Sequence, residues 1–66
     1  MTEYIDKRGW KYRVVSYRGT WKACYNKPDR NVWMSVDALL WRENREDAER
    51  DLEAYAASHG MKKVES

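Results

Sequence analysis

The regular alternation of side chains over residues 10–15 and 20–25 is the feature that most constrains the fold of this chain. A period of two places successive side chains on opposite faces of a β-strand, and both segments are rich in the aromatic and β-branched residues that strands favour. Arg18 and Gly19 lie between them, and glycine supplies the positive φ that a tight hairpin turn needs. The sequence therefore predicts an antiparallel hairpin on which the other elements pack.

A two-residue turn at Arg18 and Gly19 fixes which side chains share a face of this hairpin. It places Tyr12 opposite Tyr25 and brings the large apolar residues of both strands to one face. We take this face as the predicted core. Its members are Trp10, Tyr12, Val14, Trp21, Ala23 and Tyr25.

A second Arg-Gly pair, Arg8-Gly9, predicts another two-residue turn nearer the N-terminus. Such a turn pairs Ile5 with Tyr12, adds Ile5 to the core face and turns Tyr4 to the other side. One face of an antiparallel sheet is often solvated. The face opposite the predicted core contains both apolar and basic residues, so we expect it to be the solvated one. It is expected to carry Tyr4, Lys11, Arg13, Val15, Tyr17, Lys22 and Cys24.

The segments that follow the hairpin are less uniform in pattern. Residues 26–31 have the composition of a turn throughout, and residues 32–36 are predicted to form the next strand. Residues 37–42 fit either an extension of that strand or a loop packed on the core. The tail, residues 62–66, fits either a frayed end or a short edge strand.

One helix is predicted near the C-terminal end. Asn44 is a favoured N-cap, and Asp47 follows it by three residues, as in a variant of the capping box. Gly60 is a favoured residue for ending the helix, because it readily adopts the left-handed conformation. Met61, the next residue, is then placed to pack back onto the helix. Between these signals, helical spacing puts one set of side chains on a single face: Ala48, Leu52, Tyr55, Ala56 and His59.

Together these elements predict an α+β fold in a single domain spanning residues 1–66, since 66 residues suffice for one core only. We expect a three-stranded antiparallel sheet, with a possible fourth strand in the middle or the tail, and one C-terminal helix packed on one face in the order β-β-β-α. A sheet of this size cannot bury its apolar face alone. Leu52 and Tyr55 are therefore expected to pack against Trp10, Tyr12 and Trp21.

The sequence argues against several functional classes. One cysteine, Cys24, cannot form an internal disulfide, and with a single histidine, His59, it leaves no Cys/His zinc cluster. These two residues are expected on opposite sides of the sheet, and no phosphate loop or catalytic motif is present. We therefore expect no enzyme, no metal and no cofactor. The absence of a long apolar stretch and of a secretory signal predicts no membrane segment and a cytoplasmic protein.

Charge is distributed unevenly along the chain. Residues 1–42 contain nine Lys and Arg against four Asp and Glu, whereas residues 43–66 contain four against seven. The basic part includes the predicted solvated face of the sheet. On this face we expect Lys11, Arg13 and Lys22 to contact nucleic-acid phosphates, with Tyr4 and Tyr17 beside them for stacking or sugar contacts. The leading interpretation is thus a small module that binds duplex DNA, on a face free of acidic groups.

The alternative is a protein-interaction module or inhibitor that binds a protein partner or a second copy of itself. Tyr and Trp account for every aromatic residue of the chain, and their polar tips suit interfaces. Trp33 and Trp41 fit either the core or such an interface. The distribution of charge and aromatic residues in three dimensions discriminates between these two functions.

Two short motifs resemble the arm-site DNA-binding domains that precede the catalytic domains of phage-type tyrosine recombinases. The first, over residues 5–14, is Ile-x-Lys-Arg-Gly followed by an aromatic residue and Arg-x-Val; the second, over residues 44–48, is Asn-x-Glu-Asp-Ala. That family, like the AP2-type domain of plants, places a three-stranded sheet backed by one helix in the major groove. The resemblance implies a phage-like or mobile-element protein that binds DNA through its sheet. Residues 26–43 are longer and more aromatic than the corresponding region of that family.

Overall fold

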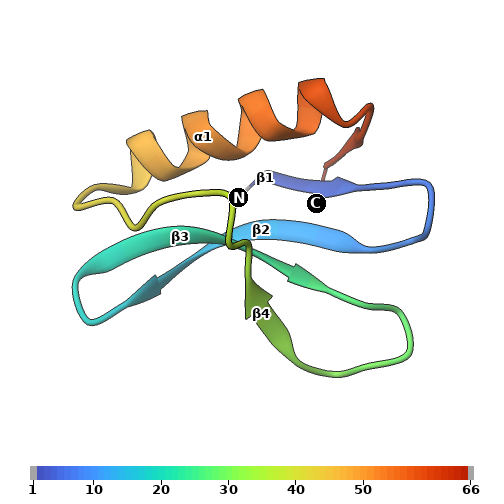
Figure 1. Cartoon of the computed structure of the whole chain (residues 1–66), viewed down its shortest axis with the longest axis horizontal. Coiled ribbons are helices and arrows are strands. Elements are labelled where there is room, and N and C mark those ends of the chain that lie inside the picture. The colour runs from blue at the N-terminus through green and yellow to red at the C-terminus, as the bar shows by residue number, and fades with distance from the viewer. Residues whose placement is uncertain (1, 66) are drawn as a thin grey trace.

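A computed structural model describes residues 2–65, which form an antiparallel sheet of five strands and one helix (Figure 1). The spatial order of the strands is β4-β3-β2-β1-β5. The elements are β1 (Thr2–Ile5), β2 (Lys11–Tyr17), β3 (Thr20–Asn26), β4 (Trp33–Ser35), α1 (Arg45–Ser58) and β5 (Lys62–Glu65). The helix packs on β2 and β3 from one side of the sheet.

The predicted α+β class with one helix on one sheet face is confirmed. The sheet has five strands, where three or possibly four were predicted, because both the middle segment and the tail form strands. The tail is the edge strand that the sequence left open. It pairs antiparallel with β1, and Lys62 and Lys63 give this edge the charge that discourages pairing with another chain.

The β2–β3 hairpin has the predicted register. Tyr12 pairs with Tyr25 and Val14 with Ala23 across the two strands. Arg18 and Gly19 both have positive φ, 51° and 80°, as a two-residue type I′ turn requires. The backbone twist of this turn matches that of the strands, so the longest hairpin of the fold is set by two residues.

The β1–β2 turn differs from the prediction by one residue. Asp6 pairs with Trp10 through its backbone N–H, and Gly9 donates to the Asp6 carbonyl, each at 3.0 Å. With Gly9 at φ 84°, this is a three-residue loop ending in a left-handed residue, a common hairpin geometry. Tyr4, not Ile5, therefore pairs with Tyr12. A shift of one residue turns every side chain of β1 to the other face.

The helix begins and ends where predicted. The Asn44 side chain accepts a hydrogen bond of 2.9 Å from the Asp47 N–H, which confirms it as the N-cap. At the other end the Gly60 N–H donates to the Ala57 carbonyl and the Met61 N–H to the Ala56 carbonyl. With Gly60 at φ 65°, these two bonds form a Schellman motif.

We call the side under α1 the covered face. It carries the side chains of Tyr4, Tyr12, Val14, Trp21, Ala23 and Tyr25. Leu52 is 1% exposed and packs there with Ala48 and Ala56, which confirms its predicted burial. Tyr55 is half-buried, and its ring centroid lies 6.2 Å from that of Tyr12.

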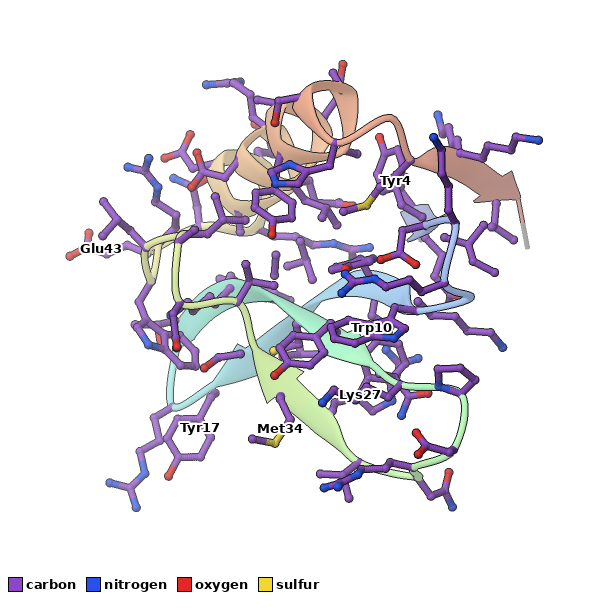
Figure 2. All side chains as sticks on the ribbon, turned by 45° about the vertical axis from the view of Figure 1, so that its right-hand side comes forward. Tyr4, Trp10, Tyr17, Lys27, Met34 and Glu43 are labelled. Carbon is purple, nitrogen blue, oxygen red and sulfur yellow. The ribbon has the colours of Figure 1, made fainter. Side chains whose placement is uncertain are left out.

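We call the opposite side the open face. The register assigns to it Glu3, Ile5, Lys11, Arg13, Val15, Tyr17, Lys22, Cys24, Trp33, Lys62 and Val64. In Figure 2 Tyr4 lies beside the helix, whereas Tyr17 points away from it. The open face is the place where a functional surface was predicted.

Candidate nucleic-acid interface

Four of the five predicted site residues share the open face. Lys11, Arg13 and Tyr17 come from β2, and Lys22 comes from β3, opposite Val15. Tyr4, the fifth, was placed there wrongly: it is 9% exposed and belongs to the core on the covered face. The three-residue turn of the β1–β2 hairpin is the cause of this error.

The same shift brings an acidic residue to the open face. Glu3 pairs with Arg13 across β1 and β2, and on its other side with Val64 of β5. The expectation of a face without acidic groups is therefore wrong. The described side chains of the open face nevertheless carry four lysines and arginines against this single carboxylate, so the face keeps a positive excess.

Two of the cations lie over tryptophan rings. The Arg13 guanidinium carbon is 4.0 Å from the centroid of Trp33, and the Lys22 ammonium is 5.5 Å from that of Trp41. Cation–π contacts of this kind stabilise by about 0.5–2 kcal/mol. Lys22 is only 7% exposed, and the Arg13 Nε is buried without a hydrogen-bond partner among the described residues. Both cations are thus packed into the face, while Lys11 is exposed on it.

The most exposed part of the face is an aromatic pair. Tyr17 is 56% exposed and Trp41 46%, and their ring centroids are 6.1 Å apart at an angle of 48°. The guanidinium of Arg18 lies 5.3 Å from the Tyr17 ring. Two neighbouring aromatic rings beside cations present a surface on which planar groups stack.

Trp41 was not among the predicted site residues, and its position follows from its neighbour. Arg42 forms two backbone hydrogen bonds with Trp21, of 2.7 and 2.8 Å, and its guanidinium binds both carboxylate oxygens of Asp51 on the helix. Arg42 is thereby held on the covered side. Because neighbouring residues in extended backbone point to opposite sides, Trp41 turns to the open face. The alternation of Trp41 and Arg42 was the available signal in the sequence.

Ion pairing separates the two sides of the molecule. The ion pairs among the described residues are Arg8–Asp6, Arg42–Asp51, Arg45–Glu49 and Arg50–Asp47. Each of them uses a carboxylate of the β1–β2 turn or of α1. Among the described side chains, the cations of the open face have no carboxylate within salt-bridge distance. Lys11 and Lys62 are exposed and thus available to an external anion, whereas Arg13 and Lys22 are packed into the face.

Cys24 lies on the open face and is buried there. Burial raises the pKa of its thiol, although the charges of Lys22 and Arg13 act in the opposite direction. A raised pKa disfavours the thiolate, which is the reactive form. His59 caps the C-terminal end of α1, so the sheet separates the two groups. No thiol–imidazole pair is formed.

A second polar cluster surrounds the β1–β2 turn. The carboxylate of Asp6 accepts hydrogen bonds from the N–H groups of Arg8 and Trp10, the Arg8 guanidinium and the Tyr12 hydroxyl. Burial by itself raises the pKa of Asp6, but these hydrogen bonds together bring it below its usual value of 3.8. Burial, with the bond to Asp6, raises the pKa of Tyr12 to about 12. These groups serve to hold the turn.

Among the described side chains, those of residues 2–64, no group of three or more His, Cys, Asp and Glu is arranged to bind a metal ion. Within the same range, α1 is too short and too polar to cross a bilayer. No family model matches the chain, and no curated protein or solved structure matches it significantly. The arrangement of the open face is therefore the basis for the function proposed below.

Proposed function

We propose that this chain is a non-enzymatic module that binds nucleic acid on its open face. The observation that carries the proposal is the coincidence, on one uncovered sheet face, of cations without carboxylate partners and an exposed aromatic pair. Lys11 and Arg13 are suited to phosphate contacts, and Tyr17 and Trp41 to base stacking. Lys22 supports this surface by packing under Trp41.

The width of the sheet favours single strands over duplex DNA. Strands lie about 4.8 Å apart, so five strands span roughly 19 Å, whereas the major groove is only about 12 Å wide. A three-stranded sheet, as in the recombinase arm domains that the motifs resemble, is much narrower. Stacking on Tyr17 and Trp41 also needs bases that are not paired within a helix. We therefore propose a single strand lying across the open face.

A salt titration with a short fluorescent oligothymidine and a duplex of equal length tests this proposal. We expect the single strand to bind more tightly and its affinity to fall with salt. In a variant with Lys11, Arg13 and Lys22 all changed to Met, the logarithmic salt slope should fall by roughly 1.4, since each of the two phosphate contacts proposed for Lys11 and Arg13 contributes about 0.7. Methionine keeps the volume of these packed side chains. Circular dichroism checks that the fold persists, and Lys11→Met with Arg13→Met replaces the triple variant if it unfolds.

A charge-matched control removes three cations elsewhere. Lys7 in the β1–β2 turn, Arg50 on α1 and Lys63 on β5 are exposed and lie off the open face. Changing all three to Met lowers the net charge equally. An equal loss of affinity in this control, or no binding of either nucleic acid at low salt, would contradict the proposal.

The second candidate function is binding of a protein partner along β4. Val32, Met34 and Leu40 are exposed apolar residues in and beyond this short edge strand. An unpaired edge with apolar side chains can accept a strand from another chain. Sedimentation equilibrium tests the self-association form of this function: a dimer that Met34→Lys dissociates would support it.

A further inference from the structure

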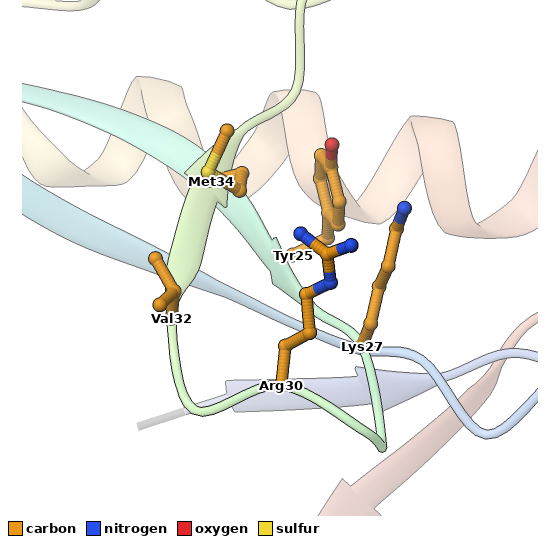
Figure 3. A pocket seen from close by; sticks show the side chains of 5 residues that line it. All are labelled: Tyr25, Lys27, Arg30, Val32 and Met34. Atoms are coloured by element: carbon orange, nitrogen blue, oxygen red, sulfur yellow. The ribbon is translucent and has the colours of Figure 1, made fainter.

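A pocket lies on the helix side of the sheet, away from the open face, where β3 leads into β4. It has a volume of about 140 Å³ and is lined by Tyr25, Lys27, Arg30, Val32 and Met34. Figure 3 shows the side chains of Lys27 and Arg30 extending toward the same space as the Tyr25 ring. We propose that this pocket is a binding site for an aryl phosphate, that is, one aromatic ring carrying a phosphate group.

The charge of the pocket indicates an anion. Lys27 and Arg30 both line it, and neither forms a salt bridge with a carboxylate among the side chains of residues 2–64. Two like charges placed at one hollow repel each other, and a bound anion relieves that repulsion. An arginine fork and a lysine together suit phosphate, because the guanidinium binds two oxygens and the ammonium acts as a point charge.

The walls of the pocket indicate a planar apolar group. Tyr25 stacks on Trp10 with ring centroids 5.3 Å apart and planes 16° from parallel, which fixes the orientation of its ring. Val32 and Met34 supply apolar surface opposite the cations, although both are largely exposed. A volume near 140 Å³ suits one six-membered ring, since a cavity of about 150 Å³ holds benzene.

Hydrogen bonds within the β3–β4 loop hold the walls of the pocket in place. The Asn26 side-chain amide donates to the carbonyls of Arg30 and Val32, at 3.1 and 2.9 Å, and the Arg30 N–H donates to the Lys27 carbonyl at 3.0 Å. The ammonium of Lys27 also lies 4.9 Å from the centroid of Trp10. These contacts restrain the loop that carries both cations, so little ordering is needed on binding.

Titrations followed by amide NMR shifts test the site with three probes: phenyl phosphate, inorganic phosphate and phenol. We expect phenyl phosphate to shift the amides of residues 25–34 and to bind roughly tenfold more tightly than either fragment. This comparison uses the unmodified protein, so it does not depend on the folding of a variant. Equal affinity for phenyl phosphate and inorganic phosphate, or shifts located elsewhere, would overturn the proposal.

Two double variants test whether Lys27 and Arg30 supply the charges that bind the phosphate group. Lys27→Met with Arg30→Met should weaken phenyl phosphate binding at least tenfold, and Arg50→Met with Lys63→Met, which removes two exposed cations elsewhere, should leave it unchanged. An equal effect of both pairs would show nonspecific charge attraction and overturn the site.

A short glycine peptide containing phosphotyrosine presents the same aryl phosphate group as a side chain of a polypeptide. If the peptide binds as tightly as phenyl phosphate, the ligand of this pocket can be a phosphorylated side chain of another protein. If the peptide does not bind, the ligand is a free small molecule.

Discussion

The two faces of the sheet contain similar residue types and use them in opposite ways. On the covered face Tyr4 and Tyr12 are buried under α1, whereas on the open face Tyr17 and Trp41 are about half exposed. Carboxylates follow the same division, since those in ion pairs lie in the β1–β2 turn and on the helix. Aromatic content therefore does not distinguish core from function in this chain. For Tyr4, Tyr12 and Tyr17, the turn that sets the register of the strand decides on which face the ring lies.

The strongest test of this contrast exchanges one tyrosine on each face for alanine. Tyr4→Ala should lower the free energy of unfolding by roughly 3–5 kcal/mol, the range for large aromatic residues in cores. Tyr17→Ala should change it by about 0.5 kcal/mol or less, because its ring is mostly in solvent. Urea unfolding followed by circular dichroism measures both. Equal losses from the two variants would break the division into a covered and an open face.

A pair of leucines sharpens the same contrast on the helix side. Leu52→Ala should cost roughly 2–5 kcal/mol, since the side chain is 1% exposed and its removal leaves a cavity. This loss is a large part of the stability of a small domain. Leu40, at 66% exposed, is the matched control, and Leu40→Ala should change stability by about 0.5 kcal/mol at most. A loss below about 1 kcal/mol for Leu52→Ala would refute its place in the core.

The Asp6 carboxylate, which holds the turn that sets the register of β1, makes the stability of the protein depend on pH. Asp6→Asn should lower stability at neutral pH by about 1.5–3 kcal/mol, because the charged acceptor of the turn is lost. The pKa of Asp6 is lowered in the folded state, so its contribution is complete above the usual value of 3.8 and disappears as pH falls through the lowered pKa. The stability difference between the protein and the variant should therefore vanish in strong acid. A difference that is constant with pH would assign the effect to something other than the carboxylate charge.

The smallest predicted effect concerns the start of α1. Asn44→Ala should cost about 0.5–2 kcal/mol by removing the acceptor for the Asp47 N–H. Asn31 lies exposed in the β3–β4 loop and serves as the control, with an expected change of about 0.5 kcal/mol or less. Thermal unfolding resolves a difference of this size. No difference between the two variants would mean that the cap contributes nothing to the packing of the helix on the covered face.

The sequence predicted those elements whose signals are local. Asn44 and Gly60 determine the ends of α1, and Arg18-Gly19 determines the β2–β3 register. The same dipeptide at Arg8-Gly9 was misleading, because Asp6 begins a type I turn there and Gly9 is its fourth residue. Asp three residues before Gly was the signal for that turn, and missing it placed Tyr4 on the wrong face.

Other features depend on contacts between distant segments. The tail becomes β5 because β1 offers it an unpaired edge, which no pattern within residues 62–66 reveals. Trp41 joins the open face because Arg42 is held by Trp21 and Asp51. The predicted placement on the open face was therefore correct for the residues within the β2–β3 hairpin, and it was wrong for Tyr4 and did not include Trp41.

The four tryptophan indole N–H signals give the most direct test of the proposal that function lies on the open face. Trp33 and Trp41 contact the cations of that face, whereas Trp10 and Trp21 lie on the covered side. The measurement adds a short oligothymidine at low salt to protein carrying Lys27→Met and Arg30→Met, so that the pocket beside Tyr25 does not contribute. We predict that the Trp33 and Trp41 signals shift and the Trp10 and Trp21 signals stay in place. Shifts of Trp10 and Trp21 without Trp33 and Trp41, or no shifts at all, would contradict the account.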